Sequence, residues 1–443
     1  MNLVEIWQDN NSLLKLGDNM KDDLSKFSVL FYSPILVYMF LLVSFSLVAI
    51  YSSYPLSQEQ YPIGNNFVTR QVLFFGVGTL ILMIVLLLGL ERMKLLRWWF
   101  YGGGMVLLLG IFIHTQTSAS VPFVFGTKGA TRWYRIGPIS LQPSEFMRIA
   151  LILVVADLIQ VHNRTYSRLK RTIKFDFILI VKVIAVVIPP AILIYKQPDS
   201  GITLLILITT AIMLLIGGIH WRYIIVIGGL TLFIVSLFII TANRYPDILI
   251  NTLGIAPYRI SRFSGWFDPF GTISGEGNQL ARGMVAIGSG GLLGNGLQSG
   301  LIYFPEAHTD FIFAVIGKDF GLIGSLALVI LYGLFNFEIL NTSLLNENPY
   351  HRLVCSGIFA SLVTQQFWNI GMCLGLLPIS GLTLPFISHG GSSVLASMIL
   401  FGLILSSYVE GSNFYNKKAR IQKPILYLNT KPYLKKEIKK KNL

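Results

Sequence analysis

The stretch EAHTDFIFAVIGKDFG places ionisable side chains both before and inside an apolar run. Glu306, His308 and Asp310 stand directly before the run, where two carboxylates and an imidazole could bind a polar ligand or move a proton. Lys318 and Asp319 lie within the run. An ionisable side chain near the centre of a bilayer costs about 2.5–3.5 kcal/mol on insertion scales, so a charge there needs a partner. We therefore expect the first three residues at the rim of a site and the last two as an internal ion pair.

Polar motifs come directly before four apolar stretches that are predicted to start on the same side of a membrane. They are QPSEF (142–146), QPDSG (197–201), HTDF (308–311) and SHGGSS (388–393). A helix N-terminus leaves backbone N–H groups free and carries roughly half a positive charge, so a converging set suits an anionic ligand such as a phosphate. Glu145, Ser392 and Ser393 belong to these motifs, and Arg132 lies in the loop before the first one. These four residues are candidates for binding the ligand.

Each motif taken alone also has an ordinary structural explanation. Pro143 suits the first position of a helix, Asp310 can cap a helix, and Gly390 and Gly391 let helices approach closely. Capping accounts for one polar residue at each helix start. It does not account for a His, several carboxylates and Arg132 on one side, so we favour a binding site.

The composition indicates that these elements lie in a membrane. Hydrophobic residues make up 53% of the 443 residues and charged residues only 13%, which excludes an ordinary water-soluble domain. We predict an all-α polytopic membrane protein with about ten transmembrane helices. The predicted spans are 29–51, 71–90, 98–114, 144–161, 175–195, 201–218, 222–241, 309–340, 353–375 and 390–410.

The distribution of Lys and Arg predicts the orientation of these spans. If the N-terminus is cytoplasmic, most Lys and Arg residues fall in cytoplasmic loops and in the C-terminal tail. Because basic residues concentrate on the cytoplasmic side of a membrane protein, both termini are predicted to be cytoplasmic. This divides the chain into a cytoplasmic segment 1–28 without signal-peptide character, a membrane domain 29–410 and a basic cytoplasmic tail 411–443. The long loops 115–143 and 242–308 are then extracytoplasmic, the second lying between helices 7 and 8. The net charge of +14 is explained by attraction to anionic lipid rather than to nucleic acid.

The remaining polar residues suggest structural roles. Cys355 and Cys373 lie on one predicted helix, too far apart for a disulfide. No CxxC, HExxH or Cys/His cluster occurs, so no structural zinc site is predicted. Asp157 and Lys182 lie toward the inner ends of consecutive spans, and we expect them to form an ion pair.

Several motifs in order closely resemble the SEDS family, the shape, elongation, division and sporulation proteins typified by RodA and FtsW. They are GATRWYRIGPISLQPSEFMRIALIL (129–153), QPDSG (197–201), AIGSGGLLGNG (286–296), FPEAHTDFIFAVIG (304–317) and NIGMCLGLLPISGLTLPFISHGGSS (369–393). The resemblance covers nearly the whole chain beyond the first span and is closer to the RodA branch. It implies a peptidoglycan glycosyltransferase that polymerises lipid II at the outer face of the bacterial plasma membrane, with undecaprenyl pyrophosphate as the leaving group and inversion at the anomeric carbon.

The resemblance also assigns candidate site residues. Family members carry a key Asp in the long loop, in a stretch like WFDPFG, which makes Asp268 the candidate catalytic base. Gln279 follows it at a longer spacing than in relatives, so Glu276 in SGEGNQ is a rival. Arg148 and Gln279 join the candidates for substrate binding. The chain departs from the family at Lys318, where a Glu is expected, and at His389, where a Tyr is expected.

Two other classes of function remain open from the sequence. A lipid II flippase would need ionisable residues through the full depth of the helices, whereas most motif residues here cluster at one side. A non-catalytic scaffold of the elongation or division complex would need no carboxylate in the outer loop. The resemblance further implies a class B penicillin-binding protein as partner, beside other elongation or division membrane proteins. No resident cofactor is predicted, although Mg²⁺ or Mn²⁺ could assist at the pyrophosphate.

Overall fold

The computed structural model describes most of the predicted membrane domain. The described residues are 33–58, 66–117, 121–127, 130–136, 139–166, 173–244, 263–275, 277–299 and 302–428. The predicted segment 1–28, the end of the predicted tail 411–443 and Glu276 lie outside the described residues, and the three-part division of the chain stays a prediction.

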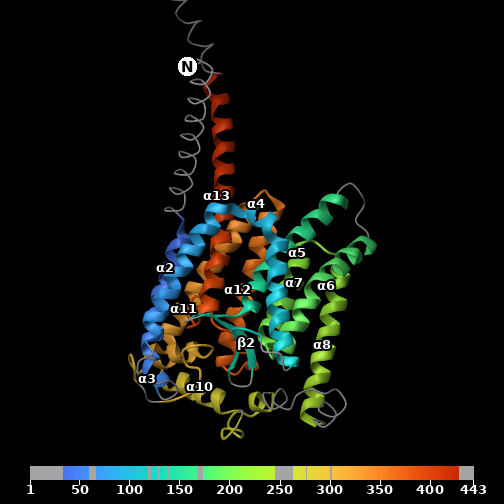
Figure 1. Cartoon of the computed structure of the whole chain (residues 1–443). Coiled ribbons are helices and arrows are strands. Elements are labelled where there is room, and N and C mark those ends of the chain that lie inside the picture. Colours follow the sequence, from blue (N-terminus) through green and yellow to red (C-terminus); the bar gives the residue numbers. More distant parts are fainter. Residues whose placement is uncertain are drawn as a thin grey trace, which may run out of the picture.

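Long helices standing side by side form the body of the molecule (Figure 1). They are α2 (Pro34–Ser52), α4 (Phe67–Gln116), α5 (Pro143–Tyr166), α6 (Ile173–Lys196), α7 (Ser200–Ile216), α8 (Trp221–Arg244), α11 (Ile312–Leu345), α12 (Pro349–Cys373) and α13 (Gly391–Leu428), with the shorter α3 (Tyr54–Gln58) and α10 (Asn278–Ser289) at one end of the bundle. In the part of the chain that the structure describes, each of the ten predicted spans overlaps one of these helices over most of its length. Within the described residues, five helices are long and apolar enough to cross a membrane: α2, α4, α6, α11 and α13.

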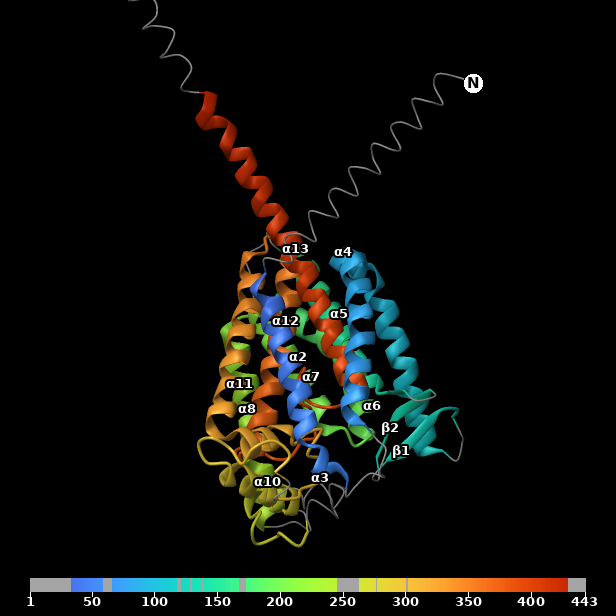
Figure 2. The same cartoon turned by 90° about the vertical axis from the view of Figure 1, so that its left-hand side faces the viewer.

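Helix α4 contains two of the predicted spans because it reverses direction. Gly89 interrupts it with φ of 73° and ψ of 161°, a conformation that costs little only for glycine. Figure 2 shows the two legs of α4 on either side of this reversal, one rising to the end of the bundle and one returning.

Burial separates inner helices from outer ones. Every residue of α5 from 147 to 156 is buried, which is expected for a helix that is apolar on all faces. The apolar stretch of α13 is 78% buried, whereas that of α4 is 22% buried and exposes Leu, Val and Ile side chains. The exposed apolar faces of α2, α4 and α11 are therefore suited to contact lipid.

A small antiparallel sheet corrects the prediction of an all-α protein. Its strands β1 (Val124–Thr127), β2 (Ala130–Ile136) and β3 (Ile139–Leu141) lie in that order within the first long loop. Val124 pairs with Tyr134, and Tyr134 pairs in turn with Leu141. Aromatic and β-branched residues favour these strands, but each is too short to give a clear alternating pattern in the sequence.

Tyr134 fixes this sheet to the second leg of α4. Its hydroxyl donates a hydrogen bond to the Leu107 carbonyl at 2.8 Å. A Cβ at Gly110 would lie 2.3 Å from the same hydroxyl, so the contact requires a glycine at that position. Burial raises the pKa of Tyr134, and its hydroxyl therefore stays protonated as a donor.

Helix α11 is interrupted near its start, and a glycine-rich loop forms hydrogen bonds with the backbone groups at the interruption. Gly321 has φ of 65° and ψ of −160°, which interrupts the helical ladder. The Asn295 and Gly296 N–H groups donate to the carbonyls of residues 318 and 319, while the N–H groups of residues 322 and 323 donate to the carbonyls of residues 291 and 292. The backbone groups released by the break are thus paired with the loop 291–296.

One predicted ion pair is confirmed and another is wrong. Lys318 and Asp319 pair at 3.1 Å and are both fully buried. Asp157 pairs with Lys94 at 3.4 Å and Arg97 at 2.7 Å instead of with Lys182, which is exposed on α6. The reversal of α4 at Gly89 brings residues 94–97 beside α5, a proximity that spacing along the chain does not indicate. Both cysteines are free, as predicted.

Candidate functional site

Two of the predicted motifs meet around Asp199, just before α7. The side chains of Gln142 and Ser144 donate hydrogen bonds to Asp199 Oδ2 at 2.8 and 3.2 Å. The other carboxylate oxygen accepts from the backbone N–H of Ile202 at 3.4 Å and so caps α7. We call Arg132, Gln142, Ser144, Glu145, Arg148 and Asp199 the Asp199 cluster.

Arg132 enters this cluster from β2. Its Nε donates to the Gln197 carbonyl at 3.2 Å, a terminal nitrogen donates to the Pro198 carbonyl, and its guanidinium lies 3.9 Å from Asp199. The side chain is 19% exposed. These contacts compensate the positive charge within the protein and hold the turn between α6 and α7.

Glu145 and Arg148 lie deeper, in the first turns of α5. Their side chains pair at 3.0 Å and are almost fully buried. Arg148 also donates to the Gln365 side chain on α12, and Gln365 donates to the Thr383 carbonyl at 2.9 Å. The pair therefore ties α5 to α12 and to the segment that leads toward α13.

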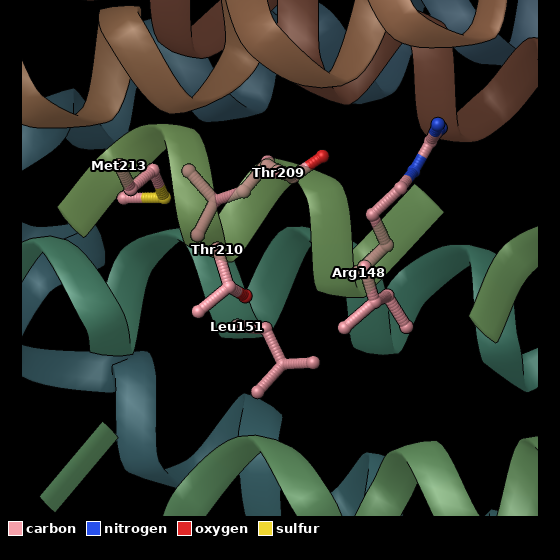
Figure 3. Close-up of a pocket in the computed structure, with 7 residues that line it drawn as sticks. Arg148, Leu151, Thr209, Thr210 and Met213 are labelled. Atoms are coloured by element: carbon pink, nitrogen blue, oxygen red, sulfur yellow. The ribbon is translucent and has the colours of Figure 1, made fainter. Parts of the chain in front are cut away.

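A small cavity lies beside Arg148, between α5 and α7. It is lined by Arg148, Leu151, Ile152, Ile206, Thr209, Thr210 and Met213 (Figure 3). Its volume of about 10 Å³ is close to the minimum for one water molecule, so it cannot hold a sugar or a phosphate. In the described part of the chain the buried Thr209 hydroxyl has no hydrogen-bond partner, which makes it a suitable contact for such a water. The cavity is not a substrate site.

A second group of polar residues surrounds His308 at the same end of the bundle. The His308 ring is buried and lies 4.5 Å from the Phe67 ring and 5.8 Å from the His389 ring. His389 Nδ1 lies 3.0 Å from the Gln71 amide oxygen, so this nitrogen carries the proton. Burial, with a smaller effect of the neighbouring His308 and Arg70, lowers the pKa of His389 to about 3. The ring is therefore neutral at physiological pH.

Glu306 and Asp310 share one hydroxyl donor in this group. The Thr309 hydroxyl lies 2.8 Å from Glu306 Oε2 and 2.7 Å from Asp310 Oδ1, although its single proton can serve only one of them at a time. Glu306 has φ of 55°, in the left-handed region, and both carboxylates are half-buried. The Asp310 carbonyl accepts from Asn369 at 2.7 Å. We call residues 306–310 together with Gln71 and His389 the His308 cluster.

Ser392 and Ser388 of the SHGGSS motif together connect these two clusters. Ser392 donates to the Ser140 carbonyl at 2.9 Å and accepts from the Gln142 backbone N–H at 2.8 Å, which joins the sheet and the start of α5 to the start of α13. Ser388, on the same turn, donates to the Thr309 carbonyl at 2.6 Å. Ser393 makes a local bond to the Gly390 carbonyl at 3.2 Å.

Asp268 lies in an exposed turn of the second long loop. Its carboxylate accepts from the Gly271 backbone N–H at 2.8 Å, as an Asp-Pro turn residue does. Trp266 anchors the turn by donating to the Gly375 carbonyl at 2.9 Å, and Gln279 of α10 donates to the Pro305 carbonyl at 3.3 Å. The desolvation expected for a catalytic base is absent here, because the Asp268 side chain is exposed.

The structure thus brings most of the predicted residues together in two clusters and leaves Asp268 outside them. The sequence prediction missed Asp199, Gln142, Ser144 and Gln365 as individual residues, although the first three lie in quoted motifs. Their signal was that two separate helix starts both carry a Gln-Pro pair with a carboxylate.

Comparison with known proteins identifies the family of this chain. Residues 33–412 match the family model described as cell cycle protein, which covers FtsW, RodA and SpoVE. A protein of Thiomicrospira cyclica named "Probable peptidoglycan glycosyltransferase FtsW" is 32% identical over 84% of this chain and 90% of its own. Stage V sporulation protein E of Bacillus subtilis is 27% identical over 83% of this chain and 93% of its own.

Solved structures share the fold. A chain of a peptidoglycan synthase complex that coordinates polymerization and crosslinking aligns with a TM-score of 0.67 at 25% identity, over 85% of this chain and 97% of that one. RodA of Thermus thermophilus aligns with a TM-score of 0.58 at 24% identity, over 84% of this chain and 95% of that one. The similar sequences above are named FtsW and SpoVE, so the predicted preference for the RodA branch is not supported.

Proposed function

Because the chain belongs to the FtsW/RodA/SpoVE family of cell cycle proteins, we propose that it is a peptidoglycan glycosyltransferase that polymerises lipid II into glycan strands. The observation that carries the proposal is the convergence of the QPSEF, QPDSG, HTDF and SHGGSS motifs at one end of the bundle, beside the sheet and the loop that contains Asp268. A lipid-linked substrate needs polar groups of this kind at the end of helices whose outer faces contact lipid.

The proposed reaction joins two lipid II molecules. The 4-hydroxyl of GlcNAc on one molecule attacks the anomeric carbon of MurNAc on the other, the bond to the pyrophosphate breaks, and undecaprenyl pyrophosphate leaves with inversion. A base must take the hydroxyl proton because an unactivated hydroxyl is a poor nucleophile. We assign that role to Asp268, whose exposed carboxylate uses one oxygen to accept from Gly271 and, among the described residues, has the other available for a substrate laid over the turn.

The departing pyrophosphate needs stabilisation of its negative charge. The two arginines of the Asp199 cluster are balanced by Glu145 and Asp199, so they contribute no net charge. The N-termini of α5 and α7, which this cluster holds in place, supply oriented N–H groups and positive dipole ends for the anion. A divalent cation such as Mg²⁺ or Mn²⁺, bound mainly through the substrate phosphates, would add positive charge at the pyrophosphate.

The proposal includes a membrane topology and partners. Ten crossings with both termini in the cytoplasm would place the sheet, α10 and the turn of Asp268 at the extracytoplasmic face of the bacterial plasma membrane. A class B penicillin-binding protein is the proposed transpeptidase partner, supported by the similarity to a chain of a peptidoglycan synthase complex.

The experiment that tests the function is polymerisation of purified lipid II by the purified protein, with and without the partner. Glycan strands that form with the wild-type protein and not with Asp268→Asn support the proposal. A protein that moves lipid II across vesicle membranes but forms no strands would be the flippase, and one that does neither would be the scaffold.

A further inference from the structure

Three ionisable side chains meet at the other end of the bundle, far from the sheet and α10. Glu91 follows the reversal of α4 at Gly89, His351 lies in the first turn of α12, and Glu410 lies on α13. Figure 2 shows the labels of α4 and α13 together at this end of the bundle. His351 Nε2 lies 3.3 Å from Glu91 Oε1 and 3.1 Å from Glu410 Oε2. The three donor atoms all lie within 4.8 Å of one another.

From this geometry we propose that Glu91, His351 and Glu410 form a binding site for one divalent transition-metal ion, with zinc as the best fit. Zinc binds imidazole nitrogen and carboxylate oxygen at about 2.0–2.2 Å in a tetrahedral arrangement, which separates neighbouring donors by about 3.3 Å. The two nitrogen-to-oxygen distances match this separation. A solvent molecule would take the fourth position, on the side of the exposed carboxylates.

A positive charge between these groups would also be stabilising. Two carboxylate oxygens this close repel each other unless a positive charge lies between them. Lys94 acts electrostatically on His351, but it pairs with Asp157 at 3.4 Å. A divalent ion with a neutral imidazole balances both carboxylates, whereas a protonated imidazole balances only one.

The burial of His351 favours the neutral ring. The side chain is 1% exposed, and in the described part of the chain its Nδ1 has no hydrogen-bond partner. A protonated ring would leave a charged N–H buried without an acceptor, which costs more than a neutral N–H in the same place. The burial therefore favours a neutral imidazole, which is the form that binds a metal ion through Nε2.

The surrounding residues orient the ligands. Asn348 caps α12 and donates to Glu91 Oε1 at 2.9 Å. Gly89, with its positive φ, makes the reversal that places Glu91, and a Cβ at this glycine would lie 3.6 Å from Glu410 Oε1. The ion would connect the ends of α4, α12 and α13, a role that is independent of the proposed polymerase chemistry.

The test uses full-length protein in detergent, freed of metal with EDTA and titrated with ZnCl₂ in a calorimeter. We expect one zinc per chain and a higher midpoint of thermal unfolding with zinc bound. Loss of an orienting group beyond the ligands costs 10–100-fold in metal affinity, so Glu91→Gln and His351→Gln should each weaken binding by at least about 100-fold. Glu338→Gln, a carboxylate substitution on α11 outside the cluster, is the matched control and should bind as the wild type does.

The result can overturn the proposal without reference to activity. Absence of stoichiometric zinc binding by the wild type, or equal binding by the wild type and Glu91→Gln, would show that the three residues form an ion pair network only. Glu91 is exposed, so its variant is expected to fold even if His351→Gln does not. Displacement of zinc by an equal concentration of MgCl₂ would also contradict the proposal, because imidazole favours zinc over magnesium.

Discussion

The exposed carboxylate of Asp268 is the residue on which the proposed chemistry depends. Asp268→Asn removes the proton acceptor but keeps a carbonyl oxygen for the Gly271 N–H. We expect polymerisation of lipid II to fall by roughly 10²–10⁴-fold, with little change in the midpoint of thermal unfolding. The measurement is glycan-strand formation in detergent, with expression and partner binding followed in parallel.

Glu276→Gln is the matched control for this prediction. It tests the rival carboxylate in the same loop and should keep substantial activity. Near-normal polymerisation by Asp268→Asn, or its loss in Glu276→Gln alone, would transfer the role of base to Glu276.

Asp199 is expected to matter first for stability. Its carboxylate accepts hydrogen bonds from Gln142 and Ser144 and lies beside Arg132. Asp199→Ala leaves these donors without their acceptor, and each buried donor left unpaired costs about 1–3 kcal/mol. We expect a clearly lower midpoint of thermal unfolding and reduced polymerisation, with Asp199→Asn intermediate in both. An unchanged unfolding midpoint in Asp199→Ala would contradict this role.

The sequence could predict a contact between buried charges only where the two partners are close together in the chain. Lys318 and Asp319 are adjacent in the chain, so their pairing needed only the expectation that buried charges are compensated. Asp157 obeys the same rule, but its partners come from a different helix that reverses at Gly89. The Asp199 cluster likewise depends on contacts between a strand and two helix starts, and no spacing along the chain reveals them.

At the scale of elements, the break in α11 is the feature most sensitive to a small change. Gly321 has a positive φ, and a Cβ there would lie 2.5 Å from the Gly294 backbone nitrogen. Gly321→Ala must therefore displace the loop 291–296 and also adopt a backbone conformation that is essentially restricted to glycine and costs about 1–3 kcal/mol. We expect a large fall in the unfolding midpoint or in the yield of folded protein.

Gly333→Ala provides a control on the same helix. Nothing lies within 4 Å of a Cβ at that position, and alanine stabilises a helix interior by about 0.5–1 kcal/mol relative to glycine. Its unfolding midpoint should be equal to that of the wild type or slightly higher. Equal effects of the two substitutions would show that the break does not depend on Gly321.

The helices were predictable and the sheet was not, for physical reasons. A long apolar run leaves few alternatives to a helix in a membrane, so each of the ten predicted ranges overlaps a helix. Strands of three to seven residues give no such signal. The pairing of Val124 with Tyr134 also depends on contacts between Tyr134 and α4 that only the folded structure contains.

At the scale of the whole molecule, the proposed topology can be tested by cysteine labelling in intact cells. Cys355 and Cys373 are buried and must first be replaced. A cysteine at Gly275, where a side chain meets only an ordinary contact, should react without permeabilisation. A cysteine at the exposed Arg92, near the reversal of α4, should react only after permeabilisation. The opposite pattern would invert the proposed orientation.

The bond between Ser52 and Asp319 has a consequence for the order in which the protein is made. The Ser52 hydroxyl at the end of α2 donates to Asp319 at 2.6 Å, and the two residues are 267 positions apart. At about 5–20 residues per second, synthesis of the intervening chain takes on the order of 10–50 seconds. During that interval the nascent chain contains α2 but not yet Asp319, the acceptor for the Ser52 hydroxyl in the complete protein. The last turn of α2 can therefore reach its final hydrogen bonding only after the start of α11 has been synthesised.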